Sequence, residues 1–145
     1  MKLQITTAAL IAFSATAFAQ QAGQPSALPS GFETKPLIKS GKTADGDVLQ
    51  YPKTEKPEIV AVTGTIQPGG RTPLHQHPIP VFVHVMEGEL EVQTEGKETR
   101  SYKTGDSFIE SMNRSHQAFN KGTSPAKILV VFVGEEGKPT TVVPK

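Results

Sequence analysis

The sequence predicts an all-β domain, built as a sandwich or small barrel of short strands. Of its 145 residues, 13 are glycine and 12 are proline, and so many breakers favour short strands joined by turns over a helical bundle. No segment shows sustained helical periodicity. Turn residues instead separate β-branched runs at intervals of about 8–12 residues, which is typical of all-β sandwiches and barrels.

Residues 1–19 are predicted to be a secretory signal peptide. Lys2 supplies a positive start, residues 5–13 are mostly apolar, and residues 17–19 read Ala-Phe-Ala, a pattern typical of signal-peptide cleavage. The apolar stretch is too short for a membrane span, which needs about 20 residues. We therefore expect cleavage after Ala19 and a periplasmic or secreted product with no membrane anchor.

Residues 20–31 are rich in Gln, Pro, Ala, Ser and Gly and are predicted to be a flexible lead-in to a single domain over residues 32–145. Without Lys2 the chain has 14 basic residues (15 less one) and 14 acidic residues. The charges form no basic run, which argues against a nucleic-acid partner. The absence of cysteine excludes a disulfide framework, a thiolate nucleophile and Cys-ligated zinc.

The strands of the domain are predicted from β-branched or alternating residues, and the turns from Gly, Pro, Asp and Asn. The strongest runs are IVAVTGTI, VFVHVM and ILVVFV, and the last is typical of a buried strand. The predicted strands cover residues 59–66, 81–86, 90–94, 98–103, 107–110, 115–120 and 128–133, with a short extended piece at 74–77 and an edge strand at 139–145.

His75 and His77 are the first candidates for chemistry. They lie two residues apart on an extended piece, and the period of two puts both imidazole rings on one face, a few ångström apart. Converging neutral imidazoles suit a divalent first-row transition metal. Histidines in a surface turn are the alternative, and this pair alone does not decide between the two.

The residues around these histidines resemble the two conserved motifs of the cupin family. Residues 69–88 follow the pattern G-x5-H-x-H-x10-G, and residues 105–120 follow the pattern G-x10-H-x3-N. The resemblance implies a single jelly-roll β-barrel, also called a double-stranded β-helix, with one metal ion inside. It implies that His75, His77 and His116 are the metal ligands, and that the protein is a homodimer.

The chain departs from the cupin pattern at three positions. The first motif has a glutamate near Pro80 or Val81, and neither of these residues offers a metal ligand through its side chain. The second motif has Pro and Gly where this chain has Ser111 and Asn113. Asparagine tolerates positive φ, so we expect the turn at Asn113 to be preserved.

Glu110 is the candidate replacement for the missing glutamate. Alternation along residues 107–110 puts Phe108 and Glu110 on one face of the strand. In cupins an apolar residue usually occupies the place of Glu110 and points into the barrel. An inward carboxylate needs a metal or a cluster of imidazoles to offset its burial. We therefore hypothesise that Glu110 is a fourth ligand or a catalytic base beside the metal. The alternative is a bulge that turns Glu110 to solvent.

His84 is the fourth histidine of the chain. The alternation that points Val83 and Val85 inward sends His84 to the opposite face of the strand. The favoured interpretation is packing between sheets or at a dimer contact, and a role as ligand or proton relay is the alternative.

Apolar residues near the histidines are candidates for a substrate pocket. Phe82, Phe108 and Arg114 are the predicted substrate contacts, because an apolar wall and a guanidinium that binds an anionic group together hold a small molecule. Core packing is the alternative for the two phenylalanines, and a solvated turn is the alternative for Arg114 and for Arg71. Further apolar candidates are Met86, Phe119 and Phe132.

The sequence therefore predicts a metal-binding cupin with one divalent transition metal (Fe, Mn, Ni or Zn) and a small-molecule ligand. The family resemblance favours a dioxygenase-like metalloenzyme acting on an enol, a diketone or a phenolic compound, with Glu110 as the proton acceptor. The alternatives are a non-redox isomerase or lyase, a non-catalytic ligand-binding or sensor cupin, and a purely structural metal site.

Overall fold

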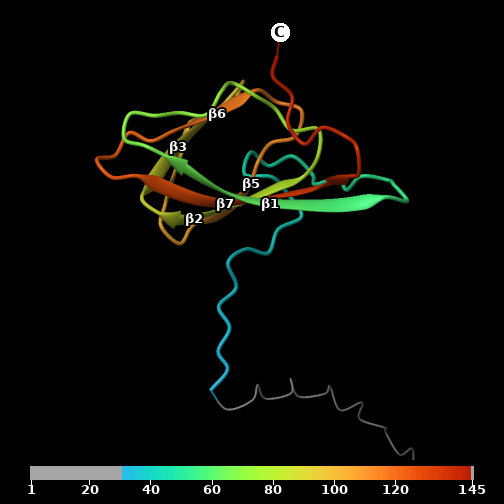
Figure 1. Ribbon diagram of the computed structural model, residues 1–145, viewed down its shortest axis with the longest axis horizontal. Coiled ribbons are helices and arrows are strands. Elements are labelled where there is room, and N and C mark those ends of the chain that lie inside the picture. The colour runs from blue at the N-terminus through green and yellow to red at the C-terminus, as the bar shows by residue number, and fades with distance from the viewer. Residues whose placement is uncertain (1–30, 145) are drawn as a thin grey trace, which may run out of the picture. The chain divides into compact units, whose positions relative to one another are not determined.

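Antiparallel strands account for the regular structure of residues 31–144, the part of the chain that this computed structural model describes. The predicted signal peptide, its cleavage site and most of the lead-in lie outside the described residues. The strands belong to the compact unit Lys35–Lys145 (Figure 1), and they confirm the predicted all-β class. Over residues 31–144 no helix is long and apolar enough to cross a membrane. The strands are β1 (Pro57–Ile66), β2 (Val81–Glu87), β3 (Glu89–Thr94), β4 (Arg100–Lys103), β5 (Ser107–Ile109), β6 (His116–Phe119) and β7 (Ala126–Glu135).

The strands form two sheets. Four strands lie in the order β1-β7-β2-β5, and three lie in the order β4-β3-β6. β2 is central in its sheet, because Val83 pairs with Val130 of β7 on one side and with Phe108 of β5 on the other. The two sheets are not closed into one continuous barrel. The predicted barrel is therefore an open jelly roll of two sheets.

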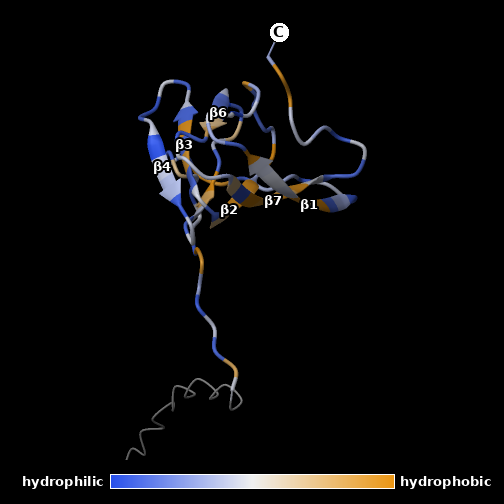
Figure 2. Ribbon diagram, turned by 60° about the vertical axis from the view of Figure 1, so that its left-hand side comes forward, coloured by the Kyte–Doolittle hydropathy of each residue, from blue (hydrophilic) through white to orange (hydrophobic). Residues whose placement is uncertain are grey.

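The alternation of β2 shows how the sequence builds the core. Val81, Val83 and Val85 are 0%, 2% and 0% exposed, whereas His84 between them is half-buried on the opposite face. The three valines pack with Leu90 of β3 in a cluster that spans both sheets. Burial of each valine side chain stabilises the folded state by about 1.5–3 kcal/mol. The strands also differ from one another in hydropathy: in Figure 2, β7 is largely hydrophobic and β4 is hydrophilic.

The segment between β1 and β2 runs antiparallel to β6 and carries the first two histidines. The amide of His75 donates to the carbonyl oxygen of His116 (3.1 Å), and the amide of His116 donates to that of His75 (2.8 Å). The turn before β6 is fixed by Asn113, whose amide donates to the carbonyl oxygen of His77 (2.8 Å). Asn113 has a φ of 54°, which confirms the expectation that asparagine preserves this turn.

The C-terminal end lies on the other side of the same segment. Val142 and Gln76 exchange two backbone hydrogen bonds of 2.9 Å each. Over residues 139–144 the predicted edge strand is thus a single bridge rather than a strand. The extended piece 74–77 is paired with β6 on one side and with the C-terminal segment on the other, and this double pairing fixes the direction of its histidines.

Candidate metal centre

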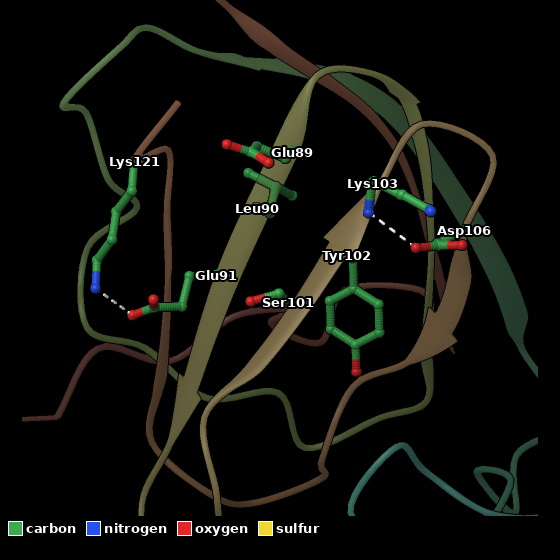
Figure 3. A pocket seen from close by; sticks show the side chains of 8 residues that line it. All are labelled: Glu89, Leu90, Glu91, Ser101, Tyr102, Lys103, Asp106 and Lys121. Atoms are coloured by element: carbon green, nitrogen blue, oxygen red, sulfur yellow. Dashed lines mark hydrogen bonds and ion pairs between the residues drawn. The ribbon is translucent and has the colours of Figure 1, made fainter. Parts of the chain in front are cut away.

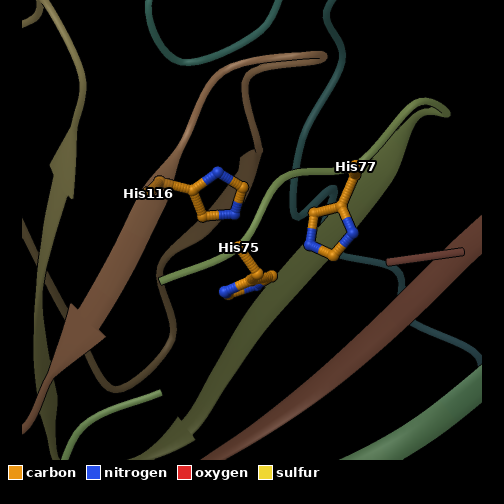
Figure 4. Close-up of side chains that lie close together, drawn as sticks. All are labelled: His75, His77 and His116. Carbon is orange, nitrogen blue, oxygen red and sulfur yellow. The ribbon is translucent and has the colours of Figure 1, made fainter. Parts of the chain in front are cut away.

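Three imidazole rings converge between the two sheets (Figure 4). The potential ligand atoms of His75, His77 and His116 all lie within 4.8 Å of one another. His77 and His116 are 3% and 1% exposed, and His75 is half-buried. The structure therefore brings together the three histidines predicted as metal ligands.

Backbone pairing explains this convergence. His75 and His116 face each other directly across an antiparallel bridge, so their rings lie on the same side, with centroids 4.5 Å apart. His77 follows His75 by two residues and projects to the same face, with ring centroids 4.8 Å apart. The site is thus built from two short extended pieces that are far apart in the sequence.

The outer nitrogen of each ring is held by a backbone carbonyl. A carbonyl oxygen only accepts, so each Nδ1 carries the hydrogen and donates, and each Nε2 is left with a free lone pair. Such carbonyl partners are typical of metal-ligating histidines, because they fix both the tautomer and the ring orientation. The acceptors are the oxygens of Pro73 (2.7 Å from His75), Thr140 (2.7 Å from His77) and Arg114 (2.9 Å from His116).

The Nε2 atom of His116 is the clearest sign that a cation belongs here. It is buried and has no hydrogen-bond partner among the described residues. A buried polar nitrogen without a partner is costly. A divalent metal bound by the lone pair of Nε2 removes that cost, so the three histidines fit the metal that their motif implies.

Glu110, the residue that follows β5, lies beside the histidines and completes the cluster. Its Oε2 lies 3.1 Å from Nε2 of His77 and 3.6 Å from Nε2 of His116, and its side chain is 11% exposed. The carboxylate therefore points inward, beside the imidazoles, and not to solvent. With both Nε2 atoms acting as acceptors, a cation or a shared proton is needed between them and the carboxylate.

The charges of the cluster are strongly coupled. Burial by itself would raise the pKa of Glu110, but the nearby imidazoles of His116 and His77 outweigh it and hold that pKa at about 2. Burial lowers the pKa of His75, which keeps its ring neutral. For His116 burial also disfavours the charged ring, but the adjacent Glu110 carboxylate outweighs it and raises the pKa. An ionised carboxylate beside imidazoles favours a cation in the centre.

An apolar pocket of about 210 Å³ opens beside the histidines. His75, His77 and Glu110 supply its ionisable lining, and Thr72 and Thr141 are its other polar residues. Phe108 lies in its wall, as predicted, and so does Phe132, whose ring centroid is 5.4 Å from that of His77. Other apolar members of the wall are Pro73, Val83, Leu90, Ala118, Ile128, Val130 and Val143. The pocket suits the apolar body of a small molecule.

Two predicted substrate contacts are not in this pocket. Phe82 lies on the opposite face of β2 from Val83, because successive residues of a strand point to opposite sides. The Arg114 guanidinium turns outward and forms an ion pair with Asp47 (3.2 Å), so it does not line the pocket. Contrary to the prediction, neither Phe82 nor Arg114 therefore lines this pocket.

The remaining candidates also lie outside the pocket lining. His84 is on the outer face of β2, where its Nδ1 is 2.9 Å from the hydroxyl oxygen of Ser107. His84 therefore lies on the opposite side of β2 from the histidine centre, and its predicted place at a dimer contact stays a prediction. Arg71 is exposed and forms a backbone bridge with Phe119.

A second pocket, of about 390 Å³, lies on β3 and β4 and contains none of the predicted site residues (Figure 3). Three of its charged groups are engaged locally: Lys121 lies 2.5 Å from Glu91, and Asp106 accepts from the backbone amide of Lys103 (2.9 Å). It therefore lacks the uncompensated buried groups that distinguish the histidine centre.

Residues 62–132 match the family model described as the Cupin domain. Together with the two motifs, the jelly-roll fold and the three-histidine centre, this match shows that the chain is a cupin-domain protein.

Similar proteins agree with this family. A germin-like protein, subfamily 2 member 2, from Arabidopsis thaliana is 41% identical over 70 residues, which are 45% of this chain and 32% of that protein. A DMSP lyase from Ruegeria pomeroyi superposes with a TM-score of 0.52 at 25% identity, over 59% of this chain and 42% of the lyase. An oxalate oxidase bound to the substrate analogue glycolate gives a TM-score of 0.51 at 28% identity, over 58% and 45% of the two chains. The matched parts thus cover less than half of each of these relatives.

Proposed function

We propose that this protein is a metal-dependent enzyme of dioxygenase type that acts on a small, mostly apolar molecule with an enol, diketone or phenolic oxygen. The observation that carries this proposal is the pairing of a buried, ionised carboxylate with three histidines, of which His75 and His77 line an apolar pocket together with that carboxylate. Perturbed carboxylates in such pockets are frequent at catalytic centres.

His75, His77 and His116 hold the metal in this proposal, and Glu110 lies close enough to be a fourth ligand or a base. A divalent Fe, Mn, Ni or Zn ion bound by three histidines supplies Lewis acidity and open coordination positions. These open positions separate a catalytic centre from a structural zinc site, which fills its four positions with protein ligands.

The pocket wall sets the class of substrate. Val83, Phe108 and Phe132 bury an apolar body and exclude water, which strengthens the electrostatic effect of the centre. None of the residues that line this pocket is a lysine or an arginine. A substrate carrying one ionisable oxygen is therefore favoured over a dianion such as oxalate, which calls for further cationic partners.

Glu110 is the proton acceptor of the proposed reaction. Its carboxylate lies at the junction of the histidines and the apolar wall. Its carboxylate is ionised at neutral pH, so it can accept a proton from an enol or phenol whose acidity a bound metal would raise.

Oxygen uptake tests this proposal. The protein is stripped of metal, loaded with Fe(II) without air, and mixed with a panel of enols, diketones and phenols in an oxygen electrode. Oxygen consumption that depends on one class of compound and is lost in His116→Ala supports the proposal. The absence of oxygen uptake with the whole panel, in a protein that binds iron and is folded, contradicts it.

A lyase or isomerase is the second candidate. It is supported by the similarity to the DMSP lyase and by a carboxylate placed to remove a proton. The same panel is then incubated without oxygen on the Zn, Mn and Ni forms. Product formation under nitrogen favours this candidate, and saturable binding without turnover favours a ligand-binding cupin.

Export of the protein is a separate proposal. The Ala-Phe-Ala pattern of residues 17–19 supports cleavage before Gln20. Mass spectrometry of the protein from a bacterial periplasmic fraction tests it, with a mature N-terminus at Gln20 as the expected result. A chain that keeps residues 1–19 contradicts it.

A further inference from the structure

The C-terminal segment of residues 139–144, here called the C-terminal strap, contacts the metal centre directly. The carbonyl oxygen of Thr140 accepts a hydrogen bond from Nδ1 of His77 at 2.7 Å, and the hydroxyl oxygen of Thr141 lies 3.3 Å from the same nitrogen. Two backbone hydrogen bonds between Val142 and Gln76 fasten the strap one residue before His77. The strap is the red end of the ribbon in Figure 1.

His77 differs from the other two histidines in where its support comes from. His75 and His116 find their carbonyl partners two residues away in the sequence, so their own loops orient them. The partner of His77 is 63 residues away, on the strap. The orientation of one ligand therefore depends on the docking of a distant segment.

The strap also forms part of the pocket. Thr141 and Val143 both line the pocket beside His75 and His77. Val143 is nevertheless 63% exposed, and Val142 is 36% exposed. A segment with exposed side chains and a single bridge of two hydrogen bonds is of the kind that opens at low cost in free energy.

We propose that the C-terminal strap positions His77 and closes one wall of the pocket, so that metal binding and strap docking strengthen each other. The inference rests on the metal centre of the proposed function and not on the reaction. When the strap is open, His77 loses the carbonyl that fixes its tautomer and aims its Nε2 at the centre. Loss of such a partner lowers metal affinity by about 10- to 100-fold.

The coupling must act in both directions. If docking of the strap raises the affinity for metal by a given factor, bound metal raises the stability of the docked strap by the same factor. If the strap were only a structural tail, bound metal would not change the stability of its docked state. The amide of Val142, which donates to Gln76, reports the docked state through its rate of hydrogen exchange.

Two variants open the strap. Val142→Pro removes the amide that donates to Gln76, and a chain that stops after Lys138 lacks the strap altogether. Val142→Ala is the matched control, because it shortens a side chain that does not line the pocket and keeps the amide that donates to Gln76. Zn²⁺ affinity is measured for each metal-free protein by competition with a chelator, along with its melting temperature.

We expect both strap variants to lose about 10- to 100-fold in Zn²⁺ affinity while their metal-free melting temperatures stay close to that of the wild type. We expect Val142→Ala to keep its affinity, and Zn²⁺ to slow exchange of the Val142 amide in the wild type. Zn²⁺ binding that is indifferent to the strap, or exchange that is indifferent to Zn²⁺, overturns this inference alone. A wild type that binds no Zn²⁺ overturns the metal centre and this inference with it.

Discussion

The amide of Glu110 donates a hydrogen bond of 3.0 Å to the carbonyl oxygen of Val81, so the two residues lie side by side where β5 ends and β2 begins. The cupin motif has its glutamate near Val81, and in this chain the carboxylate comes from Glu110 instead. The centre thus has three histidines and one carboxylate, but the carboxylate belongs to the residue after β5 and not to a residue near the start of β2.

Glu110→Gln tests the role of this carboxylate. The substitution keeps the shape of the side chain and removes its charge. If Glu110 is a ligand, we expect Zn²⁺ affinity to fall by at least about 10-fold, because a ligand is lost from the coordination shell. If it is a base, we expect metal affinity to persist while turnover falls by about 10²–10⁴-fold. Chelator competition and steady-state kinetics separate the two results.

The matched control for this substitution is Glu91→Gln. Glu91 is a carboxylate on β3 that pairs with Lys121 outside the centre. We expect Glu91→Gln to leave metal affinity and turnover unchanged. Equal metal affinity and equal turnover in Glu110→Gln and the wild type rule out both roles of Glu110.

Gly88, at the end of the first motif, is required by close packing of the backbone. Its φ is +77°, and a Cβ at this position lies 2.8 Å from the carbonyl oxygen of Pro125 and 2.9 Å from Cα of Ala126. Gly105 also has a positive φ, of +91°, but a Cβ there meets no atom within 4 Å. We expect Gly105→Ala to cost about 1 kcal/mol of unfolding free energy and Gly88→Ala about 3 kcal/mol. Denaturant unfolding measures both, and equal costs contradict the packing explanation.

Asn120, at the end of the second motif, joins three backbone groups through its side chain. The residue is 1% exposed, and its Nδ2 donates to the carbonyl oxygens of Ile66 and Ser124 while its Oδ1 accepts from the amide of Gly122. Asn120→Ala leaves these groups without partners, and we expect it to lower the unfolding free energy by about 3 kcal/mol. The exposed Gln93→Ala is the control, with an effect of less than about 0.5 kcal/mol. Similar losses in both variants contradict this role.

Tyr102 gives the protein a distinct response to high pH. Its ring stacks on Phe108 with centroids 3.8 Å apart, and burial raises its pKa to about 12. Because the folded pKa is above the unfolded value of 10, the stabilising contribution is complete below pH 10 and is lost as pH rises towards 12. Absorbance at 295 nm follows the ionisation, and Tyr102→Phe removes the late phase. A Tyr102 that ionises near pH 10 in the folded protein contradicts the burial.

The sequence was sufficient for features that depend on local alternation. The β-branched run of β2 predicted which valines are buried, the spacing of His75 and His77 predicted a shared face, and the strand before Glu110 predicted its inward direction. The same rule excludes Phe82 from the pocket, because it alternates with Val83. The prediction of Phe82 as a substrate contact rested on its apolar side chain and not on this alternation.

Features that depend on distant partners were not predictable. Arg114 pairs with Asp47, which is 67 residues away, and Ser111 donates to Asp45 at 2.5 Å from 66 residues away. Local spacing gives no signal for such contacts, since they exist only after the sheets have packed. The carbonyl of Thr140 is a further example, because every residue has a backbone carbonyl and the residue type does not indicate which one accepts a hydrogen bond from His77.

Metal content is the most direct test of the central claim, which is that His75, His77 and His116 form a metal centre. The protein is expressed from the full chain, purified without a metal-affinity tag and measured by elemental analysis, with His84→Ala as the control outside the centre. We predict one metal ion per chain in the wild type and in His84→Ala, and almost none in His75→Ala, His77→Ala or His116→Ala. A folded wild type that holds no metal, even after incubation with Fe, Mn, Ni and Zn, would contradict the account.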